Sequence, residues 1–240
     1  MRVPYPENTM RKMIVCLLIG LSAFGAGCKD KLHRAAERGD VGAQYELASY
    51  CFYGFAGVKK DLPEAAKWYR KAAEQRHVAA QFCLGCCYAK GDGVAKDLVE
   101  AVKWYRRAAE AEDGCASSWG QCALGTCYAN GDGVEKDMVE AAKWYRKSAG
   151  QGFLSAQWKL GGCYASGTGV PKDEAEAVKW YRKAAEQGDC RAQCKLGYCY
   201  LRGEGVVKDK KEAIVWFRKA VEAWGDQDAR RRLQELGETP

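Results

Sequence analysis

The sequence has very little histidine, since only His33 and His77 occur among its 240 residues, and this leaves little material for imidazole catalysis. It also lacks the local patterns of common active sites: no Ser-x-x-Lys, Gly-x-Ser-x-Gly, His-Glu-x-x-His or phosphate-loop string is present. Its acidic residues recur mainly at expected helix starts or near lysines. Because no pair of nucleophile and base can be assembled, we expect no enzymatic activity. We also expect no cofactor and no metal site.

A strong excess of one charge is also missing. The formal net charge is +7, and residues 1–28 supply +2 of it, so residues 29–240 carry +5. This bias is too mild for a nucleic-acid-binding surface, and we expect no nucleic-acid partner. With 48% hydrophobic and 29% charged residues, the composition is that of a globular protein.

The apolar run at residues 14–21 is about half of the ~20 residues that a membrane-spanning helix needs. Arg11 and Lys12 precede this run and small residues follow it, an order typical of a bacterial secretory signal. We therefore expect residues 1–28 to be a signal peptide, with Met1 or Met10 as its start, and the protein to be exported to the periplasm or secreted. Residues 25–28 resemble a lipobox, whose Cys28 would carry a lipid anchor, and ordinary cleavage after Gly25 is the alternative.

Five tryptophans mark an internal repeat, because they are spaced by 36, 40, 36 and 36 residues: Trp68, Trp104, Trp144, Trp180 and Trp216. A leucine followed by Ala or Gly precedes each of them, at Leu47, Leu84, Leu124, Leu160 and Leu196. The four extra residues of the longer interval fall around residues 112–115. Periods of this length are typical of stacked helical repeats.

Each unit is predicted to form two helices. In the second helix, Ala, Trp and Tyr positions of residues 65–73 and their copies share one stripe of helical period. Its start carries Asp-x-x-Glu, the spacing of a capping box in which the Glu returns to the amide of the Asp. The first helix carries Ala-x-x-x-Leu-Gly-x-x-Tyr, whose Gly allows a close approach of the partner helix. The Gly-x-Gly-Val string between them fits a left-handed helix stop better than a phosphate cradle.

These strings resemble Sel-1-like repeats, which are relatives of tetratricopeptide repeats, and the resemblance covers residues 40–224. It implies an all-α fold, a right-handed α/α solenoid of five helix-turn-helix repeats with terminal half-repeats. We place an amino-terminal half-repeat helix at 29–39 and a carboxy-terminal capping helix and tail at 226–240. The repeats between them are predicted at about 40–77, 78–113, 114–153, 154–189 and 190–225.

The side of the first helix that lies opposite the Ala, Leu and Tyr columns changes from copy to copy. In tetratricopeptide-like solenoids the first helices line the concave face, so the resemblance implies that these residues line a groove for a protein or peptide. The columns one before, two after and six after the leucine give these candidates: Glu46, Ser49, Cys83, Cys86, Lys90, Thr126, Asn130, Lys159, Ser166, Lys195, Tyr198 and Arg202.

Eleven cysteines follow Cys28, a density that suggests disulfides in an exported protein. The column three after the leucine borders the core, however, and repetition there favours buried thiols, at Cys87, Cys127, Cys163 and Cys199. Bridges between Cys87 and Cys122, or Cys163 and Cys194, remain an alternative, although an offset of five residues is about 7–8 Å of helix rise. Cysteine-rich relatives join a Cys at the end of a second helix to the next first helix, and Ala stands at the first of those positions here. The Cys-x-x-Cys spacing of Cys83 and Cys86 suggests metal binding or redox chemistry, but we favour a structural role for these residues.

We therefore expect a non-catalytic solenoid that binds a protein or peptide, as an adaptor or assembly factor of the bacterial cell envelope. The membrane would be reached only through the lipid anchor. One alternative is a secreted repeat protein that recognises β-lactams or peptidoglycan with weak hydrolase activity, as known for some cysteine-rich relatives. Another is a cytosolic adaptor with reduced thiols, if residues 1–28 are no signal.

Overall fold

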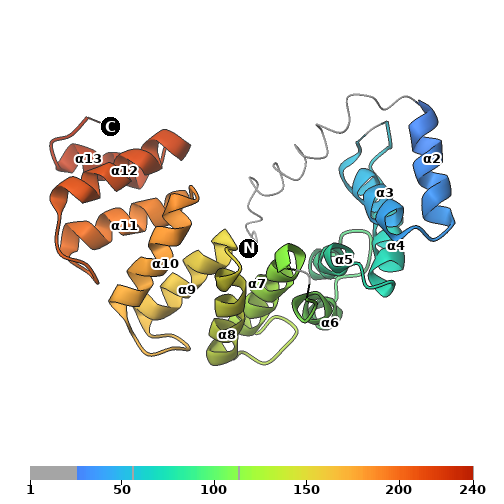
Figure 1. The fold of residues 1–240 in the computed structure, drawn as a ribbon, viewed down its shortest axis with the longest axis horizontal. Helices are drawn as coiled ribbons and strands as arrows, with labels where there is room; N and C mark the ends of the chain where they lie inside the picture. The colour runs from blue at the N-terminus through green and yellow to red at the C-terminus, as the bar shows by residue number, and fades with distance from the viewer. Residues whose placement is uncertain (1–25, 56, 113, 240) are drawn as a thin grey trace. The chain divides into compact units, whose positions relative to one another are not determined.

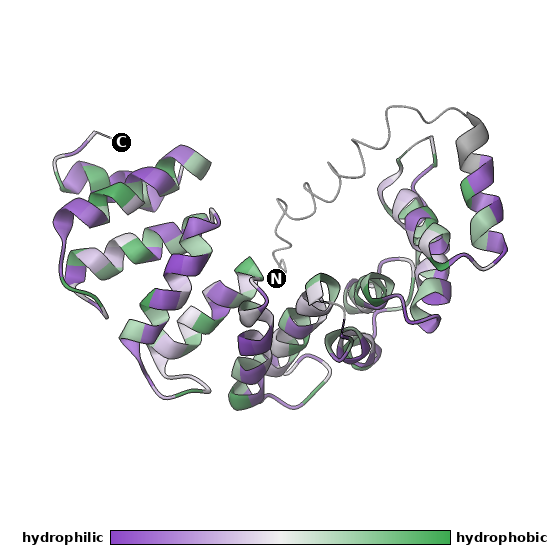
Figure 2. Ribbon diagram, viewed as in Figure 1, coloured by the Kyte–Doolittle hydropathy of each residue, from purple (hydrophilic) through white to green (hydrophobic). Residues whose placement is uncertain are grey.

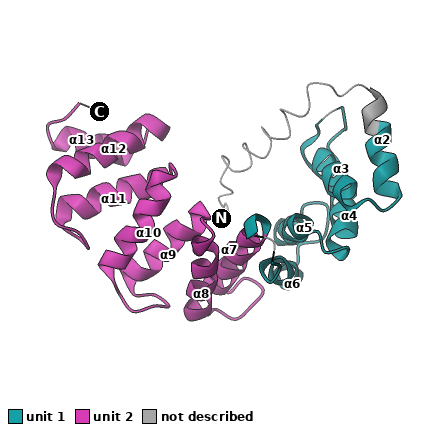
Figure 3. Ribbon diagram, viewed as in Figure 1, with its two compact units in different colours: residues 1–116 teal, residues 117–240 magenta. Residues whose placement is uncertain are grey.

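The regular structure is entirely helical in residues 26–55, 57–112 and 114–239, the part of the chain that the computed structural model describes (Figure 1). These residues form two compact units, unit 1 up to Ala116 and unit 2 from Ser117 (Figure 3). Most of the predicted signal, residues 1–25, lies outside the described residues. Its last residues do not: α2 (Ala26–Glu37) includes Cys28, so this helix begins three residues before the predicted half-repeat.

First and second helices alternate along the chain. In unit 1, each second helix packs against the first helix of its own repeat, α4 against α3 and α6 against α5. The first helices are α3 (Val41–Tyr53), α5 (Val78–Lys90), α7 (Gly114–Asn130), α9 (Leu154–Ser166) and α11 (Cys190–Arg202). The second helices are α4 (Leu62–Glu74), α6 (Leu98–Ala109), α8 (Met138–Gly150), α10 (Glu174–Glu186) and α12 (Lys210–Trp224). The last helix is α13 (Gln227–Glu235).

The four extra residues of the third copy lengthen its first helix. α7 has 17 residues, whereas the other four first helices have 13 residues each. The insertion therefore extends the amino-terminal end of α7 and leaves the spacing from Leu124 to the following second helix unchanged.

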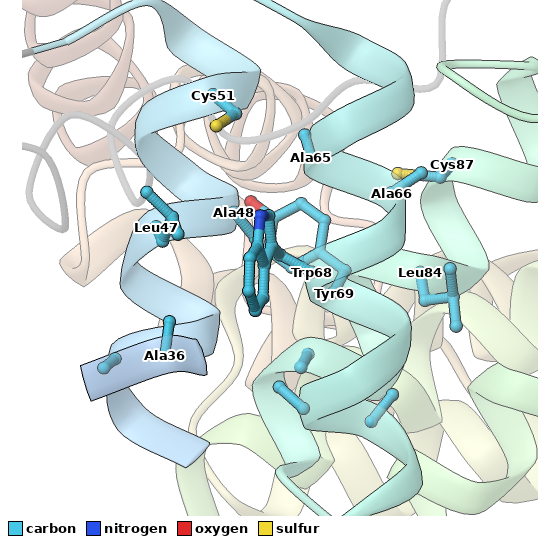
Figure 4. Packing of buried hydrophobic residues seen from close by; sticks show 14 of the residues in the cluster. Ala36, Leu47, Ala48, Cys51, Ala65, Ala66, Trp68, Tyr69, Leu84 and Cys87 are labelled. Atoms are coloured by element: carbon cyan, nitrogen blue, oxygen red, sulfur yellow. The ribbon is translucent and has the colours of Figure 1, made fainter. Parts of the chain in front are cut away.

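The core of unit 1 forms around the aromatic pair of the second helix. In Figure 4, Trp68 and Tyr69 of α4 lie among Leu47, Ala48 and Cys51 of α3, with Leu84 and Cys87 of α5 on the other side of α4. Trp68 and Tyr69 are each 3% exposed, so the predicted stripe is the buried one. Burying such side chains contributes roughly 1.5–3 kcal/mol each.

The terminal helices cover the ends of the array. α2 buries Ala36, which packs with Leu47 and Trp68. At the other end, α13 buries Ala229 and Leu233, the pair whose spacing matches a first helix. The remaining positions of α13 are mostly polar, which suits a surface that faces water.

Asp residues begin all five second helices, as predicted. Each Asp carboxylate accepts a hydrogen bond from the amide of the Glu three residues later, at 2.9–3.1 Å: Asp61, Asp97, Asp137, Asp173 and Asp209. The prediction that the Glu side chain accepts a hydrogen bond from the Asp amide is wrong. The Asp amide instead donates to a carbonyl of the preceding first helix, as from Asp97 to Tyr88 at 2.9 Å. In the first four repeats the Glu pairs with a lysine three residues on, as Glu100 with Lys103 at 2.9 Å. In the fifth repeat Glu212 accepts a hydrogen bond from Trp216 Nε1 at 2.9 Å.

The two glycines between the helices serve different purposes. The first ends its helix in the left-handed region, as predicted; Gly203 has φ +77° and its amide donates to Cys199. The second, Gly205, has φ +70° and lies against the start of the previous second helix. A β-carbon there would come within 2.1 Å of the carbonyl oxygen of Glu174. The Gly-x-Gly-Val segment therefore ends the first helix of its own repeat and also contacts the second helix of the preceding repeat.

Within the described residues, no helix is both long and apolar enough to cross a membrane. Figure 2 shows hydrophilic and hydrophobic residues mixed along the helices. This mixture follows from the helical period, because each helix buries one stripe and exposes the other.

We predict that Gly205→Ala lowers the free energy of unfolding by about 3 kcal/mol or more, because an alanine meets both an unfavourable φ and a backbone clash. Gly188→Ala is the matched control, since Gly188 has φ +89° and no atom within 4 Å of the added β-carbon. The control is expected to cost about 1–2 kcal/mol, the cost of the φ alone. Urea denaturation of both variants measures the difference, and equal losses would contradict the close approach.

Candidate partner-binding face

The side of each first helix that lies opposite its buried leucine is called here the first-helix face. In unit 1 the predicted residues on it are Glu46, Ser49, Cys83, Cys86 and Lys90. In unit 2 they are Thr126, Asn130, Lys159, Ser166, Lys195, Tyr198 and Arg202. All are half-buried or exposed except Ser49, which is 7% exposed.

The column two after the leucine contacts the aromatic ring of the second helix. The Tyr69 hydroxyl lies 3.2 Å from Ser49 Oγ, and the Tyr145 hydroxyl donates to Thr126 Oγ1 at 3.3 Å. The Tyr105 hydroxyl donates to Cys86 Sγ at 3.5 Å. These candidates therefore have a packing role inside the repeat, which the helical wheel alone did not indicate.

The fifth repeat exchanges the two residues of this contact. Phe217 replaces the tyrosine of the second helix, and Tyr198 replaces the small residue of the first, with the rings 5.2 Å apart. The Tyr198 hydroxyl donates to Asp228 of α13 at 2.6 Å and accepts from Arg232 Nε at 2.7 Å. The hydrogen bond from Tyr198 lowers the pKa of Asp228. The hydrogen bonds of Tyr198 therefore connect α13 to the first helix of the fifth repeat.

The columns one before and six after the leucine are less engaged with the core. Glu46 accepts from the Tyr50 hydroxyl at 2.6 Å within α3. Lys159 lies over the ring of Tyr145 at 5.4 Å. The column six after the leucine lies near the ends of the first helices, and its members are exposed in units 1 and 2: Lys90, Asn130, Ser166 and Arg202.

A further column of this face carries aromatic residues that the sequence analysis missed. Two residues before the leucine stand Tyr45, Phe82 and Trp158, all half-buried. Their ring centres lie 5.9, 5.9 and 5.1 Å from the second-helix tyrosine of their repeat. The signal was available, because at about 100° per residue this column lies about 40° from the column two after the leucine.

The repeated cysteines are core residues, as predicted. Cys87, Cys127, Cys163 and Cys199 are all buried. Burial raises the pKa of Cys87 to about 12 and that of Cys199 to about 11, so their thiols stay protonated near neutral pH. Neither alternative bridge is formed, because Cys87, Cys122, Cys163 and Cys194 carry free thiols.

Cys83 and Cys86 lie in the middle of α5 and not at a helix start. Burial is the main cause that raises the pKa of Cys83, and the Tyr69 and Tyr45 hydroxyls lie beside it. In the part of the chain that the structure describes, no three Cys, His, Asp or Glu side chains gather into a group suited to hold a metal ion. Cys83 is half-buried within α5, and its raised pKa keeps the thiol protonated near neutral pH.

The Sel1 repeat model matches the chain five times, at residues 41–77, 78–113, 120–153, 154–189 and 190–223. The chain belongs to the Sel1 repeat family. Together with the helices described above, this match confirms the predicted fold class, an all-α solenoid of Sel-1-like repeats. Sel1 repeat proteins are generally non-catalytic scaffolds that bind other proteins.

Solved structures similar to the chain at more than 30% identity include the following two. One is c5321, a protective antigen of uropathogenic Escherichia coli strains, with 38% identity over 87% of this chain and a TM-score of 0.80. The chain spans only 44% of that protein. The other is a Sel1 repeat protein from Oxalobacter formigenes, with 35% identity, a TM-score of 0.74, and coverage of 88% of this chain and 89% of that one. A search of curated protein sequences gives no significant match.

We predict that iodoacetamide at pH 8 alkylates Cys115 of the folded, reduced protein at least about tenfold faster than Cys199, since only the thiolate reacts. Cys115 is exposed, whereas Cys199 is buried and its pKa is raised to about 11. Peptide mass spectrometry after timed labelling measures both rates, and labelling in urea is the control in which they converge. Similar rates in the folded protein would show that Cys199 is not buried.

Proposed function

We propose that the chain is a non-catalytic solenoid that binds a protein or peptide through its first-helix faces, as an adaptor or assembly factor in the bacterial cell envelope. The observation that carries this proposal is the contrast between the two sides of the first helices. The buried side repeats, with Leu84, Leu124, Leu160 and Leu196 each 0% exposed. The exposed side differs from one repeat to the next.

Packing explains the buried side and not the exposed one. Every repeat has to bury the same aromatic residues, so its Ala and Leu positions recur. Lys90, Asn130, Ser166 and Arg202 share one column and one exposed setting, yet they differ in charge and size. Such a combination, a fixed scaffold with a varied surface, suits recognition of one particular partner.

Site-specific photo-cross-linking tests this proposal. A photoreactive residue replaces Ser166, which is exposed at the end of α9. The matched control replaces Lys179 on α10, whose side chain is 68% exposed. Irradiation of the full chain in the organism that produces it is expected to give a discrete adduct from position 166 and none from position 179, measured by immunoblotting and mass spectrometry. Equal adducts from both positions, or none from either, would contradict a first-helix binding face.

The envelope role depends on the segment before the repeats. We predict that protein purified from its own organism begins at Cys28 and carries acyl chains, and that Cys28→Ala loses this added mass. Intact-mass spectrometry distinguishes this product from ordinary cleavage after Gly25. A full-length mass with freely alkylated thiols would overturn export and place the search for a partner in the cytosol.

A further inference from the structure

All charged residues of the first helices of unit 2 are basic. α7, α9 and α11 contain no Asp or Glu, and their charged residues are Lys159, Arg191, Lys195 and Arg202. Their positions are one residue before, five residues before or six residues after the leucine of their helix. At about 100° per residue, these positions fall within an arc of about 40° around the helix axis. The four side chains are called here the basic face of unit 2.

Contacts between helices make the basic face continuous from α9 to α11. The Arg191 guanidinium of α11 lies 5.5 Å from the ring centre of Trp158 on α9. Lys159 and Arg191 both lie close enough to Cys122 of α7 to oppose the rise in its pKa that burial causes. On α11 itself, Arg202 lies 5.2 Å from the ring centre of Tyr198.

The nearby carboxylates do not neutralise the basic face. Asp189 pairs with Arg191 at 2.6 Å, and its side chain is 4% exposed. Glu204 is shared between Lys195 at 3.6 Å and Arg202 at 3.4 Å. Among the residues that the structure describes, Lys159 forms no ion pair. A third carboxylate, Asp228, lies beside Tyr198 and pairs with Arg231 of α13 at 2.6 Å. Of the carboxylates in the described residues, only Asp189 and Glu204 pair with the four cations of the basic face, so positive charge remains in excess there.

The second helices of unit 2 use their cations differently. Lys143 and Lys179 each pair at 2.8 Å with a Glu three residues earlier on the same helix. Lys147 and Lys183 lie over the Trp144 and Trp180 rings at 4.4 and 4.2 Å. Acidic and basic residues thus alternate on these helices, and an excess of positive charge without acids on the same helix is specific to the first helices.

We infer that the basic face of unit 2 binds an acidic, extended segment of a protein partner, an inference that rests on the proposed function. The contact of Arg191 with Trp158 places α11 beside α9 on this face, and an extended chain advances about 3.3 Å per residue. A short extended segment with a few Asp or Glu can therefore follow the basic face from α9 to α11. A peptide is favoured over single-stranded nucleic acid, because Trp158 and Tyr198 are already covered by arginine and offer no open stacking platform.

Fluorescence anisotropy with the full chain tests this inference. The probe is a labelled twelve-residue peptide of alternating Glu and Ser, and its control has Gln in place of each Glu. The triple variant Lys159→Gln, Lys195→Gln, Arg202→Gln removes three cations of the basic face. The matched control, Lys143→Gln, Lys179→Gln, Lys211→Gln, removes the same charge from exposed positions of the second helices of the same unit.

The acidic peptide is expected to bind, and the glutamine peptide to bind at least about tenfold more weakly. The basic-face triple variant should lose at least about tenfold in affinity, and the control variant less than about twofold. Binding should also weaken as salt rises, because exposed charges are screened. Circular dichroism checks that both triple variants remain folded. A charge-reversal variant, Lys159→Glu with Lys195→Glu, should instead bind a peptide of alternating Lys and Ser.

Three results would overturn the inference: equal losses in both triple variants, no binding of the acidic peptide, or tighter binding of a single-stranded oligonucleotide of equal charge. Failure here is separable from failure of the proposed function. If the photoreactive residue at position 166 captures a partner while the acidic peptide does not bind, the chemistry assigned to the partner is wrong and the binding face stands. If neither binds, both proposals fail.

Discussion

The contact on which four of the five repeats depend is an aromatic ring of the second helix that lies directly on a glycine of the first helix, whereas the first repeat has Ala48 at this position. At Gly161, an added β-carbon would lie 2.6 Å from the Tyr181 ring. The same clash occurs at the equivalent glycines, with distances of 2.7–2.9 Å: Gly85, Gly125 and Gly197. The ring thereby fixes how closely the two helices approach, and it directs the tyrosine hydroxyl to the column two after the leucine. In the fifth repeat Phe217 has no hydroxyl, and the space beyond it is filled by Tyr198.

Polar side chains couple one repeat to the next. The buried Gln193 of α11 donates to the carbonyl of Ala185 at 3.1 Å, the end of the preceding second helix. In the repeat before it, Gln157 also accepts from Gln187 at 2.8 Å. Ala223, near the end of α12, stands at the position of that second glutamine, and Gln193 Oε1 remains buried without a hydrogen bond. An unmet buried acceptor costs roughly 1–3 kcal/mol, so the last repeat lacks a stabilising bond that the first, third and fourth repeats have.

The sequence was sufficient for features that depend on one chain segment at a time. The buried stripe, the Asp at each second-helix start and the left-handed glycine stop all follow from spacing and residue type, and the structure confirms them. Features that require two segments were missed or misassigned. The helical wheel tells which side Ser49 faces but not that Tyr69 reaches it, and Asp-x-x-Glu does not reveal that Tyr88 supplies the acceptor for the Asp97 amide. The close approach at Gly205 likewise depends on where the previous repeat lies.

The same division explains how a binding face can change without loss of the fold. Scaffold contacts are made by the leucine side of the first helix and by the second-helix rings, so a substitution at Lys195 leaves those contacts intact, and one at Lys159 removes only the contact of its cation with the Tyr145 ring. Cations on the second helices already have partners, since Lys219 lies 4.2 Å from the Trp216 ring centre. Cations on α9 and α11 have no acid on their own helix, and an exposed ion pair contributes only about 0–1 kcal/mol. An acidic partner segment can therefore displace Glu204 from Lys195 and Arg202 at little cost, which a tightly paired surface would not permit.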